Sequence, residues 1–145
     1  MAEFISIPEQ TVPYGQSVQL QSRRSCNKGY IIHREGAGIV TLRGAVNNQC
    51  GCSARYSITF NGNIAIPTGG TVGEISVAIA IAGEADGASL AALTPAAVDQ
   101  YGNVTSTTQV DVPKCCCTNI SVENTSSTSE AILVRNANLV VTRIG

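Results

Sequence analysis

The sequence has no tryptophan, and aromatic residues of all kinds make up only 4% of a chain that is 43% hydrophobic. Its apolar residues are therefore mostly Ala, Val and Ile. Small and β-branched side chains pack well on pleated sheets, so this composition favours a core built from strands. A chain of 145 residues suits one domain that buries a core without depending on disulfides.

Charged residues are also scarce, because they account for 13% of the chain, about half the usual share. We expect a surface with so few charges to be covered in part by neighbouring subunits. The net charge of −1 offers no field that would attract nucleic acid or an anionic membrane. Neither is therefore expected as a partner.

Long hydrophobic runs and targeting signals are missing as well. The most apolar stretch, residues 76–98, is interrupted by Glu84, Asp86 and Pro95, so no membrane span is expected. The first ten residues lack the basic and apolar regions of a signal peptide. We expect synthesis in the cytoplasm and no secretion through a signal peptide, which weakens the case for a disulfide framework.

Alternating patterns, by contrast, are frequent and predict strands. In "RYSITF" (55–60) the hydrophobic residues share one face and the polar residues share the other. The following "NGN" (61–63) predicts a turn, and "RNAN" (135–138) predicts a break between two strands. About eight to ten such strands predict one antiparallel sandwich or jelly roll over 16–145, with residues 1–15 as an N-terminal arm or edge strand.

Residues 75–82 differ because both faces of this predicted strand are apolar. The larger side chains alternate with alanines, which predicts burial on both sides. The larger residues would fill the core of the domain, and the small ones would let a sister subunit approach closely. We therefore expect Ala78, Ala80 and Ala82 to form the contact between subunits.

Five segments resemble a known family: "GQSVQL", "CNKGYIIHREGAGIVTLRG", "ARYSITFNGNIAIPTGGTVGEISVAIAIAGE", "LTPAAVDQYGNVTSTTQVDVP" and "ISVENTS…ILVRNANLVVTRIG". They are similar to small proteins encoded in phages and prophages of gut Clostridia. Those proteins are related to tumour necrosis factor and complement-type heads, including the C-terminal heads of spore-surface collagen-like glycoproteins. The resemblance runs from Val12 to the end. It implies an all-β, TNF-like jelly roll of ten strands that forms a homotrimer.

The same resemblance implies a role as a structural virion protein. The trimer would be a capsid decoration (cement) protein, a head fibre or a tail-fibre head on the virion surface, bound to the major capsid protein or another virion protein. No collagen-like stalk is present, which favours direct docking on a shell. The alternative is a free-standing, lectin-like trimeric head that binds glycans or a receptor at a spore or cell surface.

Six cysteines are present: Cys26, Cys50, Cys52, Cys115, Cys116 and Cys117. If residues 114–124 form a strand, Cys116 points to the core and its two neighbours point away. Cys50, Cys52, Cys115 and Cys117 are then candidates for disulfides or a thiol cluster. Free thiols that pack as small hydrophobes, disulfides formed after release from the cell, and a metal site all stay open, although C-x-C and CCC are not usual zinc spacings.

Catalytic patterns are not evident. His33 and Glu35 would share one face of a strand, but no nucleophile or second base lies near them in the sequence. A nucleophile elbow of the form G-x-S-x-G is missing, and Glu84 with Asp86 fits a solvated turn better than a calcium loop. We expect no enzymatic activity, no cofactor and no metal.

Overall fold

The computed structural model describes residues 2–25, 30–44, 53–127 and 129–144. These residues form twelve strands and one 3₁₀ helix, η1 (Gly87–Ser89). The strands are β1 (Ala2–Ser6), β2 (Gln10–Val12), β3 (Gln21–Ser25), β4 (Ile31–His33), β5 (Val40–Arg43), β6 (Ser53–Ala65), β7 (Ile75–Ile81), β8 (Glu84–Ala85), β9 (Ala91–Leu93), β10 (Gly102–Pro113), β11 (Cys117–Asn124) and β12 (Ile132–Arg143). The all-β prediction is confirmed.

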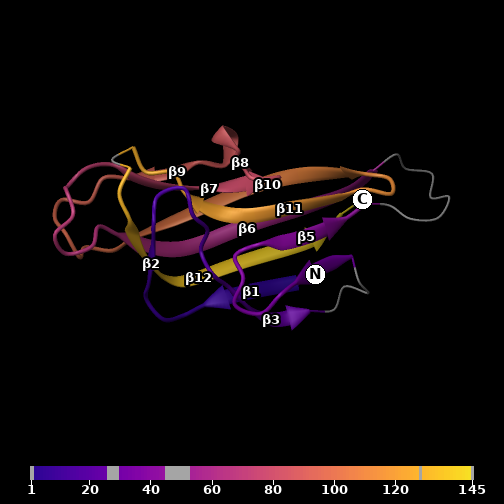
Figure 1. Ribbon diagram of the computed structural model, residues 1–145, viewed down its shortest axis with the longest axis horizontal. Coiled ribbons are helices and arrows are strands. Elements are labelled where there is room, and N and C mark those ends of the chain that lie inside the picture. The colour runs from indigo at the N-terminus through magenta and orange to yellow at the C-terminus, as the bar shows by residue number, and fades with distance from the viewer. Residues whose placement is uncertain (1, 26–29, 45–52, 128, 145) are drawn as a thin grey trace.

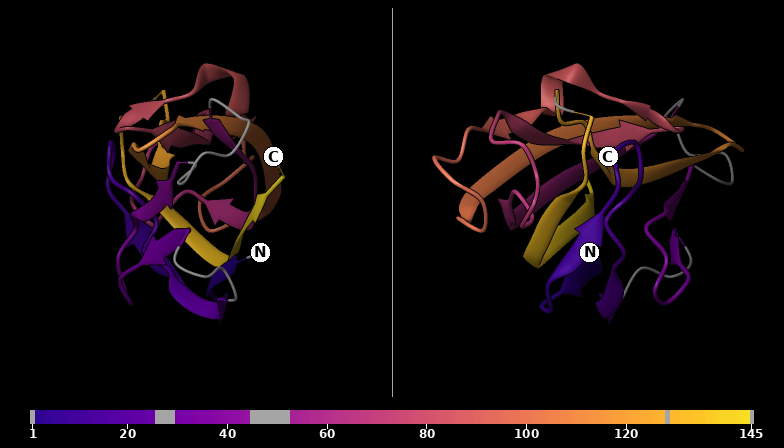
Figure 2. Two further views of the ribbon diagram at one scale, coloured as in Figure 1. Left: turned by 90° about the vertical axis from the view of Figure 1, so that its right-hand side faces the viewer. Right: turned by 60° about the vertical axis from the view of Figure 1, so that its left-hand side comes forward.

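Two antiparallel sheets form the two layers of the molecule (Figure 1). The first sheet has the order β10-β6-β12-β1-β3, and β2 continues along β12 beside β1. The second has the order β4-β5-β11-β7-β8, and β9 extends the same edge of β7. In the end-on view of Figure 2 the strands of both layers surround the core. This arrangement is the predicted jelly-roll sandwich.

The core is formed by alternate residues of the long strands, as the sequence pattern predicts. On β6 the side chains of Tyr56, Ile58 and Phe60 are completely buried, whereas Arg55 and Asn61 on the opposite face of the strand are exposed. Tyr56 reaches across to the second sheet, where its hydroxyl donates a hydrogen bond to the carbonyl of Arg43. Burial raises the pKa of this hydroxyl. The tyrosine therefore links the two layers without leaving a polar group unpaired.

The turn predicted at residues 61–63 is wrong, because β6 continues through it. Asn61 and Asn63 pair with β10 on one side, and β12 flanks the same stretch on the other. Gly62 lies against the ring of Phe60, and a Cβ at that glycine would be 3.0 Å from the ring carbon Cζ. The glycine therefore serves close packing inside a strand instead of a turn.

The break predicted at residues 135–138 is likewise a bulge within a continuous β12. The register shifts between Arg135 and Asn138, and Asn136 has a positive φ of 53°. Asparagine tolerates this left-handed conformation better than most residues. The bulge lets β12 pair with β2 at one end and with β1 at the other.

The N-terminal residues belong to the first sheet and not to a separate arm, and of their two strands β2 pairs with β12 alone, as an edge strand does. Strand β1 lies between β12 and β3, and the side chains of Ala2 and Phe4 are buried in the core. The predicted boundary at residue 15 therefore falls inside the jelly roll.

A buried asparagine connects the two sheets at one end of the molecule. The amide nitrogen of Asn124 on β11 donates to the carbonyls of Val12 and Glu130, each at 2.9 Å. Its amide oxygen accepts from the backbone nitrogen of Ser126 at 3.0 Å and from the Ser126 hydroxyl at 2.6 Å. Asn124 is 0% exposed. One side chain thus satisfies four polar groups that lie away from water.

Candidate interaction surfaces

The middle of the outward face of β10, β6 and β12 is a mostly polar surface without charge. The register aligns three cross-strand rows, which are Thr105–Asn61–Asn138, Thr107–Thr59–Val140 and Gln109–Ser57–Thr142. We call these nine residues the neutral face. Each of them is exposed or half-buried in the single chain. The neutral face is thus available to a partner.

Hydrogen bonds between side chains order one end of the neutral face. Asn103 donates from its amide nitrogen to Asn61 Oδ1 at 2.8 Å and to Asn63 Oδ1 at 3.2 Å. The Thr105 hydroxyl also lies 3.4 Å from Asn61 Oδ1. Because these amides are already paired, the surface presents a fixed pattern of donors and acceptors.

Charges adjoin the neutral face at the ends of its strands and along β1, where Glu3 pairs with Val140 and accepts a hydrogen bond from the amide nitrogen of Asn138 at 3.0 Å. At one end the guanidinium of Arg55 donates to both oxygens of Asp111, at 2.7 and 3.1 Å. This hydrogen bonding lowers the pKa of Asp111 and raises the pKa of Arg55. Both groups are about half exposed, so the pair adds little to stability.

At the opposite end, Tyr101 lies between an acid and a cation. Its hydroxyl donates to the carboxylate of Glu9, and the guanidinium carbon of Arg135 lies 3.8 Å from the centre of its ring. Burial and the hydrogen bond to Glu9 raise the pKa of Tyr101 to about 12. These contacts connect Glu9, in the segment between β1 and β2, through Tyr101 to Arg135 at the bulge of β12.

The raised pKa predicts a loss of stability in alkali. Above the ordinary phenol pKa of 10.0 the unfolded chain ionises Tyr101, whereas the folded chain keeps its proton until about 12. The stabilisation is therefore complete below pH 10 and is lost as the pH rises through that window. We expect the stability of the wild type relative to Tyr101→Phe to fall over the same range in thermal unfolding. A difference that does not change with pH would contradict this coupling.

A polar hollow lies beside this end, where β1 leads into β2. It has a volume of about 150 Å³, and its polar lining residues include Ser6, Glu9, Gln10, Gln19 and Gln21. The Gln10 amide is held at both ends, because its nitrogen donates to Ser6 Oγ at 2.8 Å and its oxygen accepts from the Gln19 backbone at 2.9 Å. A second hollow, lined partly by Ile5 and Ile7, adjoins the first. Neutral amides that can both donate and accept dominate the site.

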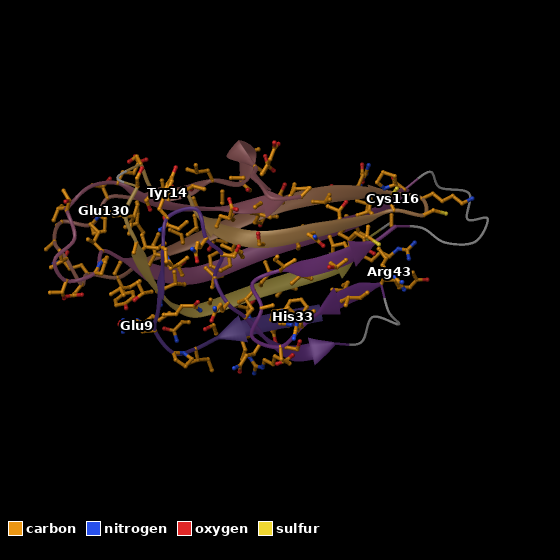
Figure 3. The ribbon with its side chains drawn as sticks, viewed as in Figure 1. Glu9, Tyr14, His33, Arg43, Cys116 and Glu130 are labelled. Atoms are coloured by element: carbon orange, nitrogen blue, oxygen red, sulfur yellow. The ribbon has the colours of Figure 1, made fainter. Side chains whose placement is uncertain are left out.

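The three consecutive cysteines lie in a turn at the other end of the molecule, beside Arg43 (Figure 3). The turn precedes β11, which begins only at Cys117, and Cys115 has a positive φ of 63°. All three thiols are exposed. The prediction that Cys116 points into the core is therefore wrong, because the strand alternation on which it depends does not extend to residues 115 and 116.

Gly44 fixes this cysteine turn against the end of β5. The backbone nitrogen of Gly44 donates to the carbonyl of Cys116 at 2.8 Å, and that of Cys116 donates to the carbonyl of Pro113 at 3.1 Å. A Cβ at Gly44 would lie 1.9 Å from the Pro113 carbonyl oxygen. Only glycine fits this close approach.

The other cysteines, Cys26, Cys50 and Cys52, lie outside the described residues. The grouping of Cys50 and Cys52 with Cys115 and Cys117 therefore stays a prediction. Within the described ranges, no group of three or more His, Cys, Asp or Glu residues is arranged to hold a metal ion.

The subunit contact predicted on β7 is wrong for two of its three residues. Ala78 and Ala80 are 0% exposed in the single chain, so they have no surface left to bury against a second subunit. Ala82 is exposed, but it lies beyond β7 in a turn with a positive φ of 55°. The burial of β7 on both faces is itself confirmed. The alanine face is covered within the chain.

His33 is fixed inside the structure. Its Nδ1 lies 3.1 Å from Ser22 Oγ, and its Nε2 lies 2.9 Å from the carbonyl oxygen of Ala37. The ring packs against Phe4 with 4.7 Å between centroids, and its side chain is 2% exposed. Both nitrogens are therefore occupied, and the imidazole joins β4 to the first sheet.

Comparison with solved structures identifies the architecture. The globular domain of a zebrafish complement 1qA protein matches 99% of this chain and 96% of its own length, with a TM-score of 0.66 and 11% identity. The fold is that of the complement C1q and tumour necrosis factor heads. An Eiger TNF from S. frugiperda matches over 99% of this chain and 91% of its own, with a TM-score of 0.67 and 9% identity. Murine APRIL matches over 95% of both chains, with a TM-score of 0.52 and 10% identity.

At these identities the C1q/TNF likeness establishes the fold and nothing finer. No family model and no curated protein sequence matches the chain. In the part of the chain that the structure describes, no helix is long and apolar enough to cross a membrane. The predicted TNF-like jelly roll is thus confirmed, whereas the phage and clostridial origin remains a prediction.

Sequence reasoning did not identify the neutral face of this C1q/TNF-like domain, although a signal for it was present. The polar positions of "RYSITFNGN" and "NVTSTTQVDV" contain only two charged residues, Arg55 and Asp111, over two long strands. Two neighbouring polar faces without charge are unusual on a surface that meets only water. The lack of charge on these two strands, instead of the alanines within residues 75–82, would have indicated a candidate contact surface.

Proposed function

We propose that this protein is a non-enzymatic head that assembles as a homotrimer through the neutral face and decorates a phage virion. The observation that carries the assembly is the absence of charge in the three cross-strand rows of the neutral face. At a three-fold axis, each residue near the axis meets its own copies. A charged residue there would meet like charges, so a neutral face is what identical copies require.

The composition of the neutral face supports contact between subunits in a second way. Thr59 and Val140 are half-buried at its centre and face each other in the register. Threonine methyl groups and valine supply apolar area, and the surrounding Asn and Gln side chains supply hydrogen bonds. This combination resembles an interface with an apolar centre and a polar rim.

The state of His33 supports a role without catalysis. It is the only histidine in the sequence, and both of its ring nitrogens have partners inside the fold. General acid–base catalysis needs a group within reach of substrate. A side chain that is 2% exposed does not meet this requirement.

The location on a virion depends on the sequence resemblance to phage-encoded heads. The test is to purify particles from an induced lysate on a density gradient and to measure the chain by quantitative mass spectrometry. We expect copies at a fixed ratio to the major capsid protein, and a trimer in native mass spectrometry of the isolated protein. Particles that lack the chain would overturn the virion role, and a monomer would overturn the assembly.

A second candidate, a lectin-like head, is favoured by the polar hollow at Gln10, Gln19 and Gln21. Amide side chains match the donors and acceptors of sugar hydroxyls, and none of the residues that line the hollow is cationic. A glycan array with the wild type and Gln21→Ala tests this candidate. Binding that the substitution abolishes, together with absence from virions, would decide for the lectin.

A further inference from the structure

The cysteine turn has a chemical character that neither proposed role uses. Cys115, Cys116 and Cys117 line one hollow of about 150 Å³ together with Arg43 and Gly44. Exposed thiols contribute little to packing, so burial does not explain three of them in succession. They are accessible to reagents from solvent, and a cation lies at the same site.

We propose that this hollow is a site of thiol–disulfide exchange that prefers small anionic disulfides. Reactive cysteines are typically partly exposed and lie in electropositive surroundings. Arg43 provides a guanidinium fork that matches a carboxylate on the incoming disulfide. Lys114, next to Cys115 in the sequence, is exposed and adds a second cation.

The acid nearest to the cysteine turn along β10 is already paired with another cation. Asp111, the acid that precedes the turn on β10, is occupied by Arg55 through two hydrogen bonds. Among the residues that the structure describes, no carboxylate lines the hollow. An anionic disulfide would therefore meet attraction at this end of the sandwich, and a cationic one would meet repulsion.

The reaction is a simple exchange that balances without any further oxidant. A cysteine loses its proton to solvent, and its thiolate attacks one sulfur of the small disulfide. A new sulfur–sulfur bond joins the protein to one half of the reagent as the old bond breaks. The other half leaves as a thiolate and takes up a proton. The products are one mixed disulfide and one small thiol.

Backbone hydrogen bonds fix the conformation of the cysteine turn. The hydrogen bonds from Gly44 to Cys116 and from Cys116 to Pro113 hold the backbone on both sides of the thiols. The residues that carry the thiols are thus presented beside Arg43 in one arrangement.

The test compares two disulfides of opposite charge on the reduced full-length chain. Glutathione disulfide supplies carboxylates, and cystamine supplies amines. We expect glutathione disulfide to modify Cys115–Cys117 about two- to fivefold faster than cystamine does, the effect of one exposed ion pair. Peptide mass mapping after limited reaction separates this turn from Cys26, Cys50 and Cys52.

Substitutions identify the cation. Arg43→Gln is expected to remove the preference for glutathione disulfide, whereas Arg34→Gln, which deletes an exposed cation outside the hollow, should retain it. Absence of modification at residues 115–117, equal rates with both reagents, or indifference to Arg43→Gln would each overturn the proposal. Native mass spectrometry measures the oligomeric state separately, so a failure of the exchange proposal can be distinguished from a failure of the proposed trimer.

Discussion

The Thr59→Arg variant is expected to be a monomer at concentrations where the wild type is a trimer. Thr59 lies in the middle row of the neutral face, between Thr107 and Val140. Arginine there would bring three like charges together and would bury each without a partner. An uncompensated buried charge costs about 3–5 kcal/mol. Summed over three subunits, this cost should weaken assembly by several orders of magnitude, as measured by light scattering after size-exclusion chromatography.

Thr41→Arg is the matched control for this variant. Thr41 is also a half-buried strand threonine with one side-chain hydrogen bond, to Asn119 at 2.8 Å, but it faces outward from the second sheet. We expect it to stay a trimer. If Thr59→Arg remains a trimer as well, the neutral face is not the subunit contact. If both variants dissociate, the loss of assembly comes from general destabilisation.

The Asn124→Ala variant is expected to lower the free energy of unfolding by about 3–4 kcal/mol. The substitution removes the partner of the buried Val12 carbonyl, of the partly buried Glu130 carbonyl, and of the Ser126 nitrogen and hydroxyl. A buried polar group left without a partner costs about 1–3 kcal/mol. Water that enters the vacated space should recover part of this cost. Chemical denaturation monitored by circular dichroism measures the change.

Asn119→Ala on the same strand is the control. Asn119 is exposed and accepts one hydrogen bond, so its loss should change the free energy of unfolding by less than about 0.5 kcal/mol. Equal effects of the two substitutions would mean that Asn124 does not join the sheets as inferred. Both variants should be measured at one protein concentration, because assembly also contributes to stability.

Much of the fold was predictable because strand alternation is a local property. The pattern at residues 55–60 identifies the buried face of β6 correctly, since each residue's face follows from its parity alone. The prediction of a turn at residues 61–63 was wrong because pairing on both sides of β6 outweighs a local turn signal. Likewise, the alternation placed Cys116 in the core only because it could not locate the start of β11.

The proposed subunit contact was harder to predict for a different reason. The sequence correctly indicates that β7 is apolar on both faces, but it does not say which chain covers the second face. Ala80 is covered by its own chain, which no local pattern reveals. The neutral face depends on the alignment of three strands that are distant in sequence. Such an alignment appears only once the strand order is known.

The distribution of charge along the molecule has a consequence for how it approaches other surfaces. Figure 3 shows Glu9 and Glu130 near one end of the long axis and Arg43 at the other. These three residues contribute a separation of charge along the long axis that the net charge of −1 does not show. At low ionic strength this charge separation would orient the protein before contact, so that the end with Arg43 and the cysteine turn faces a negatively charged surface. At an ionic strength of about 0.1 M, screening would limit this orientation to separations of about 10 Å or less.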